Sequence, residues 1–227
     1  MKKSSYIMAT VVLASLAFGG AEAQAAVSST HTSENKINFT AGEGVVTPPV
    51  DPTNPDNPNV PNPVDPTDPT NPGTGQTGPL SIDYVSNIKF GEHKITGKDI
   101  AYKAKNANPF VQVTDIRGAG EGWHLSAKIS EFKSGNKVLR GAKLSFKDGV
   151  VKAGSSSNIS LAPTKSDVLF DNTDSKPFMD TTDNGGRGTW LTVWSGADVQ
   201  LNVVAGTPEA NTEYTSSITW ELADAPK

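Results

Sequence analysis

The stretch that decides the fold class reads GWHLSAKIS and spans residues 122–130. From Trp123 to Ile129 apolar and polar side chains alternate, which is the two-residue period of a β-strand with one face toward a core. Similar short runs occur at 81–90, 95–102, 110–116, 189–194, 199–204 and 214–222, and hairpin-turn sequences lie at 134–136 and, more strongly, at 148–149. Because many short strands with Gly-rich turns are typical of layered or closed β-structures, we predict an all-β sandwich or barrel.

Residues 1–25 have the pattern of a secretory signal peptide. A positive tip, Met1-Lys2-Lys3, precedes an apolar run over residues 7–18, and small residues at 21, 23 and 25 provide cleavage sites. The run is too short to span about 30 Å of hydrocarbon, so we expect export without membrane insertion. The chain ends in ADAPK without an apolar tail, so we expect the exported protein to be released or held by non-covalent binding.

Two segments separate the signal peptide from the predicted domain at 80–227. In the first, residues 26–47, the alternating run KINFTA at 36–41 predicts an added N-terminal strand with Ile37 and Phe39 on one face. Because a lone strand is unstable in water, we expect it to pair with the domain. The second, residues 48–79, is rich in Asp and Asn and contains eleven of the sixteen prolines. We expect a Pro-rich linker outside the core, either a stiff polyproline II spacer or a connection that closes a strand pair.

Composition and motifs exclude several kinds of site. The chain has no cysteine, which rules out disulfides, thiolate metal sites and a thiol nucleophile. A net charge of -4 and a pI near 5.4 argue against nucleic-acid binding, which needs a basic face. No His-x-x-x-His or Gly-x-Ser-x-Gly motif occurs. Carboxylate pairs for glycan hydrolysis meet only in space and stay open here, but we predict a protein that is not an enzyme and needs no cofactor.

Four segments form a pattern of their own: LSIDYVSNIKFG at 80–91, FVQVTDIRG at 110–118, GWHL at 122–125 and WEL at 220–222. Two Trp-x-Leu motifs, one after Thr-Asp-x-Arg-Gly and one near the C-terminus, make this pattern specific. Over residues 80–223 the chain resembles the WxL-domain surface proteins of low-GC Gram-positive bacteria. The resemblance implies a cell-surface protein that associates non-covalently with peptidoglycan. It also implies neighbours in a surface complex, including anchored proteins that bind WxL domains.

The two side chains of each Trp-x-Leu motif are two positions apart, so on a strand they share a face. Trp123 and Leu125 continue the apolar face of the 122–130 strand, and Trp220 and Leu222 form the second motif. This pattern favours a core position for both motifs, which makes them a signature of the fold. The alternative is an exposed aromatic platform that stacks on sugar rings.

Candidate binding residues lie on other strands. Trp190 and Trp194 share one face of the 189–194 run, whose other face is also apolar. That strand is either central and buried twice, or it exposes its tryptophans to a sugar or protein ligand. Lys128, Lys143 and Lys147 belong to a basic cluster suited to anionic wall polymers, although lysines on edge strands also guard sheets against aggregation.

The polar stretch at 171–186 contains four aspartates, two asparagines and two glycines. Oxygen ligands in a loop suit calcium, but the spacing lacks the EF-hand pattern, and the same residues favour solvated turns. With the resemblance to WxL-domain proteins, which implies wall association, we predict an extracellular cell-surface protein that binds peptidoglycan or an associated wall polymer without covalent attachment. The alternative is a subunit of a surface complex that an anchored partner protein retains.

Overall fold

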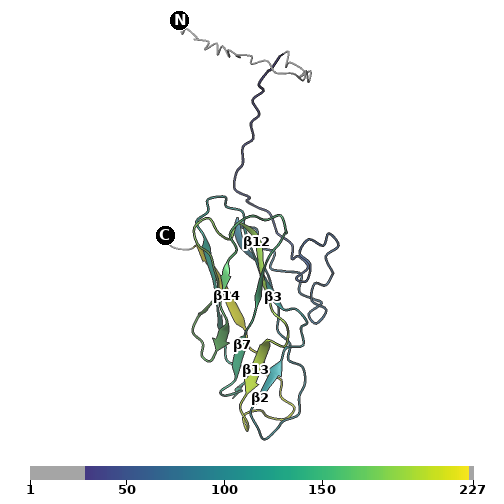
Figure 1. Cartoon of the computed structure of the whole chain (residues 1–227). Coiled ribbons are helices and arrows are strands. Elements are labelled where there is room, and N and C mark those ends of the chain that lie inside the picture. Colours follow the sequence, from purple (N-terminus) through teal and green to yellow (C-terminus); the bar gives the residue numbers. More distant parts are fainter. Residues whose placement is uncertain (1–28, 225–227) are drawn as a thin grey trace, which may run out of the picture. The chain divides into compact units, whose positions relative to one another are not determined.

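The computed structural model describes residues 29–224, and all its regular secondary structure is β-strand (Figure 1). The predicted signal peptide, residues 1–25, lies outside this part of the chain. The chain divides into two units, residues 1–38 and 39–227, and every strand belongs to the second. Residues 29–224 contain no helix that could cross a membrane. The all-β fold predicted from the sequence is confirmed.

Within residues 29–224, fourteen strands form three four-stranded antiparallel sheets and one hairpin. Sheet I has, in spatial order, β1 (Leu80–Val85), β3 (Phe110–Asp115), β12 (Gly188–Val193) and β8 (Val150–Ala153). Sheet II has β10 (Val168–Phe170), β7 (Lys143–Phe146), β13 (Val199–Val203) and β2 (Ile100–Lys103). Sheet III has β14 (Ile218–Asp224), β4 (Trp123–Ile129), β11 (Lys176–Asp180) and β9 (Thr164–Lys165). The hairpin pairs β5 (Lys133–Ser134) with β6 (Lys137–Val138).

The two predicted turns have different outcomes. The turn at 134–136 closes the β5–β6 hairpin, as its sequence indicates. At 148–149 a tight turn also forms, with Asp148 at a positive φ of 52°. It joins β7 of sheet II to β8 of sheet I, so these adjacent strands do not pair and the hairpin predicted at 148–149 is wrong. Turn chemistry fixes the local reversal, and the partners of each strand are set by the core.

One hydrophobic core receives side chains from all three sheets, which gives the fold its sandwich-like character. Phe146 of sheet II contacts Phe178 of sheet III edge-on, with ring centroids 5.4 Å apart. The same ring contacts Trp194, directly after β12 of sheet I, with centroids 5.1 Å apart. Such edge-to-face contacts add about 0.5–1.5 kcal/mol each to the burial of the rings. These rings therefore join the sheets at the centre of the domain.

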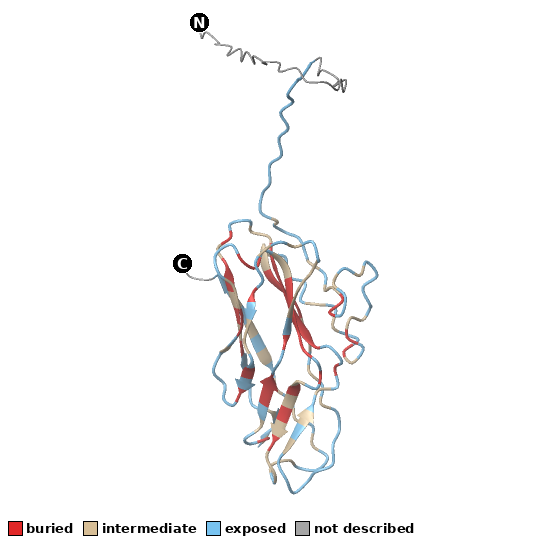
Figure 2. Cartoon of the chain, viewed as in Figure 1, coloured by how far each residue is buried: buried red, intermediate tan, exposed pale blue. Residues whose placement is uncertain are grey.

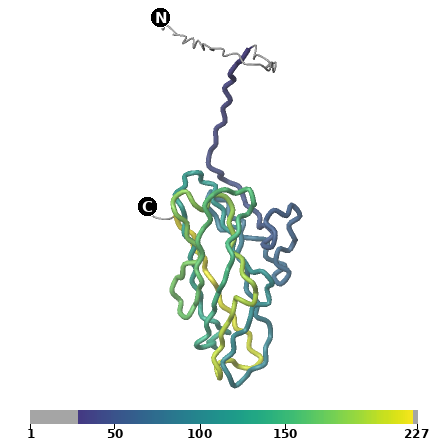
Figure 3. Tube along the Cα trace, viewed as in Figure 1, coloured from purple at the N-terminus to yellow at the C-terminus, as the bar shows by residue number. Residues whose placement is uncertain are grey.

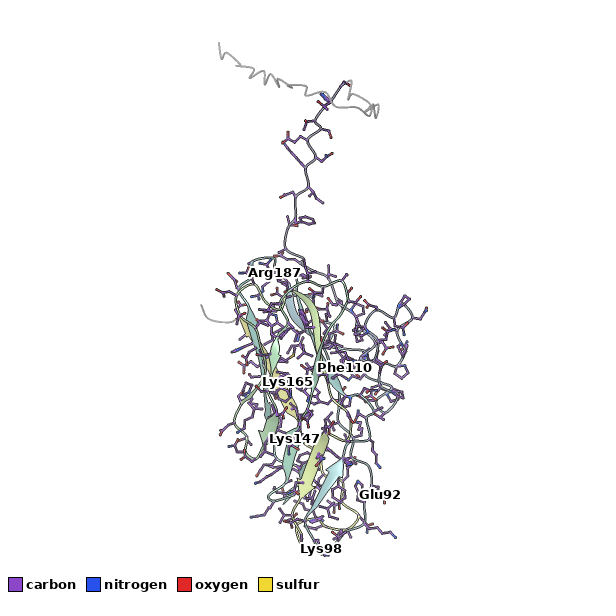
Figure 4. All side chains as sticks on the ribbon, in the orientation of Figure 1. Glu92, Lys98, Phe110, Lys147, Lys165 and Arg187 are labelled. Carbon is purple, nitrogen blue, oxygen red and sulfur yellow. The ribbon has the colours of Figure 1, made fainter. Side chains whose placement is uncertain are left out.

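A second, smaller core lies on the opposite face of sheet I and is closed by the Pro-rich segment. We call residues 48–76 the strap. Val50 and Val64 of the strap pack on a buried cluster of sheet I residues: Tyr84, Phe110, Leu191 and Val193. Figure 3 shows the strap as the blue tube beside the strands, and Figure 2 shows buried positions within it. Phe110, labelled in Figure 4, belongs to the face that the strap covers.

The strap repeats the sequence Val-Asp-Pro-Thr at 50–53 and 64–67, and both copies form the same turn. The Asp51 carboxylate accepts hydrogen bonds from Thr53 N at 2.8 Å and Thr53 Oγ1 at 2.6 Å. Asp65 accepts the equivalent bonds from Thr67 at 2.9 and 2.6 Å. Aspartate side chains commonly bond the backbone two residues on in this way. Each turn therefore directs a valine toward sheet I while its aspartate is satisfied locally.

Hydrogen bonds connect the strap to the sheet along its length. The Gln112 side chain accepts from Val50 N at 2.9 Å and donates to Pro48 O at 3.0 Å. Asn106 Nδ2 donates to Asp65 Oδ2 at 2.6 Å. The expectation that this stretch stays outside any packed core, as an extended spacer would, is therefore wrong. The prolines fix turns between anchor residues instead of a continuous polyproline II rod.

The predicted N-terminal strand at 36–41 is not formed. Ile37 and Phe39 are 80% and 82% exposed. The first backbone bond to the domain comes later, from Gly42 N to Ile116 O at 3.0 Å. Near this bond β3 is paired on both sides, and the strap occupies the outer edge of β1 through Thr74 N to Asp83 O at 2.9 Å.

Strap attachment predicts a specific pH dependence at Asp51. Burial raises the pKa of this carboxyl, but hydrogen bonds from Thr53, Asn57 and Asn54 outweigh it and lower the pKa to about 2. A depressed folded pKa stabilises the native state above the unfolded pKa of about 4, and this contribution is lost as the pH falls toward 2. We expect Asp51→Asn to lower the free energy of unfolding by about 1–2 kcal/mol at pH 6 and by almost nothing at pH 2. Urea unfolding of both proteins at several pH values measures this gap, and a gap constant down to pH 2 would contradict the assignment.

Candidate functional site

The first Trp-x-Leu motif lies in the core. Trp123 and Leu125 point inward from β4, an interior strand of sheet III, and both are essentially buried. Trp123 Nε1 donates to Gly186 O at 3.1 Å. Gly186 has a φ of +69°, and a Cβ on it would lie 2.6 Å from that indole nitrogen, so glycine is required for this approach. The motif therefore has no ring available for a ligand.

The second motif has a different environment, because β14 is the edge strand of sheet III. Trp220 and Leu222 face the core but are only half-buried. The Trp220 ring lies 4.5 Å from that of Phe178, at an interplanar angle of 57°. The two motifs are thus adjacent in space, with Leu222 paired opposite Leu125. Only the second presents part of its tryptophan to solvent.

A charged cluster beside the motifs was not identified as a site from the sequence. Arg117 donates to both Asp115 oxygens, from Nε at 3.0 Å and from Nη2 at 2.8 Å, and to Gly122 O at 2.6 Å. It also pairs with Asp224 at the end of β14. Hydrogen bonding to Asp115, opposed by desolvation and helped by the nearby carboxylates, raises the pKa of Arg117 above its usual value. The Thr-Asp-x-Arg-Gly motif thus joins the end of sheet I to sheet III. In the sequence, this motif was the feature from which the charged cluster could have been predicted.

The aspartates of the stretch at 171–186 do not gather around one point where a cation could bind. Asp180 on β11 pairs with His124 at 2.8 Å, and Asp171 lies 3.5 Å from Lys176 Nζ. The end of the stretch closes over the first motif, with Thr181 N bonded to Trp123 O at 3.0 Å. Across residues 29–224 no group of three or more His, Asp or Glu side chains is placed to hold a metal ion. The end of this stretch, from Thr181 to Gly186, therefore packs on and hydrogen-bonds Trp123.

The proposed exposed surface at Trp190 and Trp194 is wrong. Their side chains are 5% and 2% exposed, and both point into the main core. β12 is an interior strand of sheet I, and its other face, with Leu191 and Val193, is covered by the strap. The strand is therefore buried twice, which is the other interpretation that its sequence allowed. The second covering layer comes from the segment expected to be a linker.

Lys128, Lys143 and Lys147 are all exposed. They do not form one continuous strand surface, because Lys128 is on β4 of sheet III while Lys143 begins β7 of sheet II and Lys147 follows it. Three further lysines between residues 128 and 152 have partners within the chain: Lys133 with Glu131, Lys137 with Glu209, and Lys152 Nζ with Pro52 O of the strap. These lysines are close in sequence, but they do not form a single basic patch on the surface.

The described residues form an open groove of about 1060 Å³. Its walls come from the loop after β1 (85–95), the loop before β14 (208–217), the start of β14, and residues of sheet II. Half-buried aromatic side chains line it: Phe90, Tyr102, Phe132, Tyr214 and Trp220. Glu92, on one wall, lies at the end of the domain opposite Arg187 (Figure 4).

The groove combines ring faces with polar groups. His93 stacks on Tyr102, with centroids 4.0 Å apart and an interplanar angle of 30°. Side chains of Asn87, Ser216 and Ser217 lie among the lining residues. Flat rings with nearby hydroxyl and amide groups suit a ligand with both apolar faces and hydroxyls. Sequence reasoning missed this site because its walls come from segments far apart in the chain.

Comparison with known proteins agrees with the geometry of the two motifs. Residues 26–226 match the family described as WxL domain surface cell wall-binding. Neither the curated proteins nor the solved structures contain a significant match. The family description concerns wall binding and not catalysis, and it indicates an extracellular protein of the cell surface. The chain therefore belongs to the WxL family of cell-wall-binding surface domains.

Proposed function

We propose that the protein attaches non-covalently to the Gram-positive wall by binding peptidoglycan in the aromatic groove, and that it acts by binding without catalysis. The observation that supports this most directly is the set of half-buried rings in the groove of a domain whose family binds the cell wall. Aromatic faces pack against the CH faces of sugars, and nearby polar groups bond their hydroxyls. Contacts that are weak singly suffice on the wall, because the ligand is dense and repeated.

Co-sedimentation with purified Gram-positive sacculi, in the absence of other proteins, tests the proposal. We expect the mature protein to pellet in a saturable manner. Tyr102→Ser combined with Tyr214→Ser should weaken binding about tenfold, since two ring contacts are lost. Leu169→Ser is the matched control, because Leu169 is a 46% exposed hydrophobic on β10 that does not line the groove. Thermal unfolding of each variant confirms that the fold is intact.

A protein that stays in the supernatant with sacculi but remains on intact cells would contradict peptidoglycan binding. That outcome would favour the alternative, in which an anchored surface protein retains this chain. Unchanged binding of the double tyrosine variant would place the wall site outside the groove.

The exposed lysines form a separate component of the proposal. If Lys128, Lys143 and Lys147 attract phosphate-bearing wall polymers, sacculi stripped of teichoic acid should bind less protein. The part of the binding that comes from these lysines should also decrease at high ionic strength, because exposed charges are already screened over about 8 Å at physiological salt. Salt-insensitive binding that survives teichoic acid removal would exclude a role for these lysines.

A further inference from the structure

The outer edge of β14 is open. This seven-residue strand pairs with β4 over its whole length without a register shift. Within residues 29–224 no backbone hydrogen bond reaches its other side. A long, regular edge strand presents a row of unpaired N–H and C=O groups that can accept a further strand. The edge of β14 is therefore a template for strand addition.

The edge of β1 in sheet I shows how this chain treats an edge that it covers itself. Thr74 N donates to Asp83 O at 2.9 Å, and Asn71 Nδ2 donates to Val85 O at 2.9 Å. These strap residues occupy the outer side of β1. No equivalent segment of the described chain covers β14.

The apolar side chains of β14 that face the core are also only partly buried. Ile218, Trp220 and Leu222 face the core but stay half-buried, while Thr219, Glu221 and Ala223 face outward and are exposed. Apolar side chains on the inward face of an edge strand are exposed along their flank, where a further strand would lie. An added strand with apolar residues on the inward face would complete their burial.

The segment at 36–41 has the pattern that such a strand needs. Ile37 and Phe39 are two positions apart and among the most exposed large hydrophobic side chains, while Lys36, Asn38 and Thr40 alternate with them. Residues 36–41 form no strand within the chain, so their backbone groups are available. Six residues match the length of β14 closely, and Lys36 can lie on the same outer face as Glu221.

We infer that residues 36–41 of one molecule add to the free edge of β14 in a second copy, with Ile37 and Phe39 beside Trp220 and Leu222. Each chain has one such segment and one such edge, so a reciprocal exchange closes as a two-fold dimer. Strand addition supplies affinity through main-chain bonds and specificity through alternate side chains. The inference is argued from the edge of β14 and residues 36–41 and not from wall binding, and of the β14 residues it shares only Ile218 and Trp220 with the groove.

The oligomeric state of the mature chain is the first test. Light scattering after size exclusion should give twice the mass of one chain. Ile37→Asp with Phe39→Asp should give a monomer, since charges cannot enter the core face. The matched control, Asn38→Asp with Thr40→Asp, adds the same two charges on the outer face and should remain dimeric. A monomeric wild type, or equal behaviour of the two variants, overturns the inference.

The absence of native cysteine allows a direct position test. A chain with Asn38→Cys, mixed with a chain with Thr219→Cys, Glu221→Cys or Ala223→Cys, should form a mixed disulfide at one of these outward positions. Asn38→Cys mixed with Lys128→Cys, one strand further into sheet III, is the control and should link poorly. If Asn38→Cys and Glu221→Cys in a single chain close only within that chain, the strand belongs to its own domain and the second copy is excluded.

Discussion

Trp123→Ala is expected to lower the free energy of unfolding by about 3–5 kcal/mol, a large part of the roughly 5–15 kcal/mol that stabilises a typical native protein. The substitution empties a fully buried indole site beneath β4 and removes the bond from Trp123 Nε1 to Gly186 O. The backbone bond from Thr181 N to the carbonyl oxygen of residue 123 does not involve the side chain, so it is retained in this variant. Urea unfolding followed by far-UV circular dichroism measures the loss.

Trp220→Ala is the comparison, because it removes the same side chain from the second motif. Trp220 is half-buried on an edge strand, so the expected loss is smaller, about 1–2 kcal/mol. Trp123→Phe retains most of the packing and isolates the hydrogen bond, worth about 1 kcal/mol. Equal losses for Trp123→Ala and Trp220→Ala would contradict the different roles given to the two motifs.

This difference affects how wall-binding data on the family motif are interpreted. Trp123 is fully buried, so weaker binding of a Trp123 variant to sacculi reports damage to the fold and not a lost contact with the wall. A Trp220 variant that stays folded tests the groove, because Trp220 lines it. Unfolding measurements therefore have to accompany every binding measurement on these residues.

Local patterns in the sequence predicted the strands well because alternation reflects burial of one face. Trp123, Leu125 and Ile129 are buried on β4, while His124 and Lys128 are not. For β12 the alternation of apolar residues allowed two interpretations: a strand buried on both faces, or a strand that exposes Trp190 and Trp194. The choice depended on whether the strap covers its second face. A strand with two apolar faces needs two covering layers, and the second layer came from a segment whose composition indicated a spacer.

The strap and the groove could not be predicted from local pattern. Asp51 and Asp65 are buried because adjacent threonines satisfy their carboxylates, whereas hydropathy alone places aspartate and proline outside a core. The Val-Asp-Pro-Thr repeat was the available signal. The groove requires knowing which loops meet, because Phe90, Tyr102 and Trp220 come from separate strands and loops.

Arg117→Ala is the second substitution with a large expected effect, again about 3–5 kcal/mol. The Asp115 side chain is 1% exposed and receives two hydrogen bonds from the guanidinium, so Arg117→Ala removes the charge partner of a buried carboxylate and keeps its bond from the backbone N of residue 117. Thermal and urea unfolding at neutral pH measure the loss. Arg117→Lys keeps the charge but not the planar fork, so it should recover only part of the stability.

Asp224→Asn is the matched control, since Asp224 contacts the same guanidinium but is 69% exposed. Exposed ion pairs contribute about 0–1 kcal/mol, so this variant should unfold close to the wild type. The bond from Arg117 Nη2 to Gly122 O then explains why the arginine matters beyond its charge, because it joins the end of β3 to the chain entering β4. If Asp224→Asn costs as much as Arg117→Ala, the stability comes from the surface pair and not from the buried connection between the sheets.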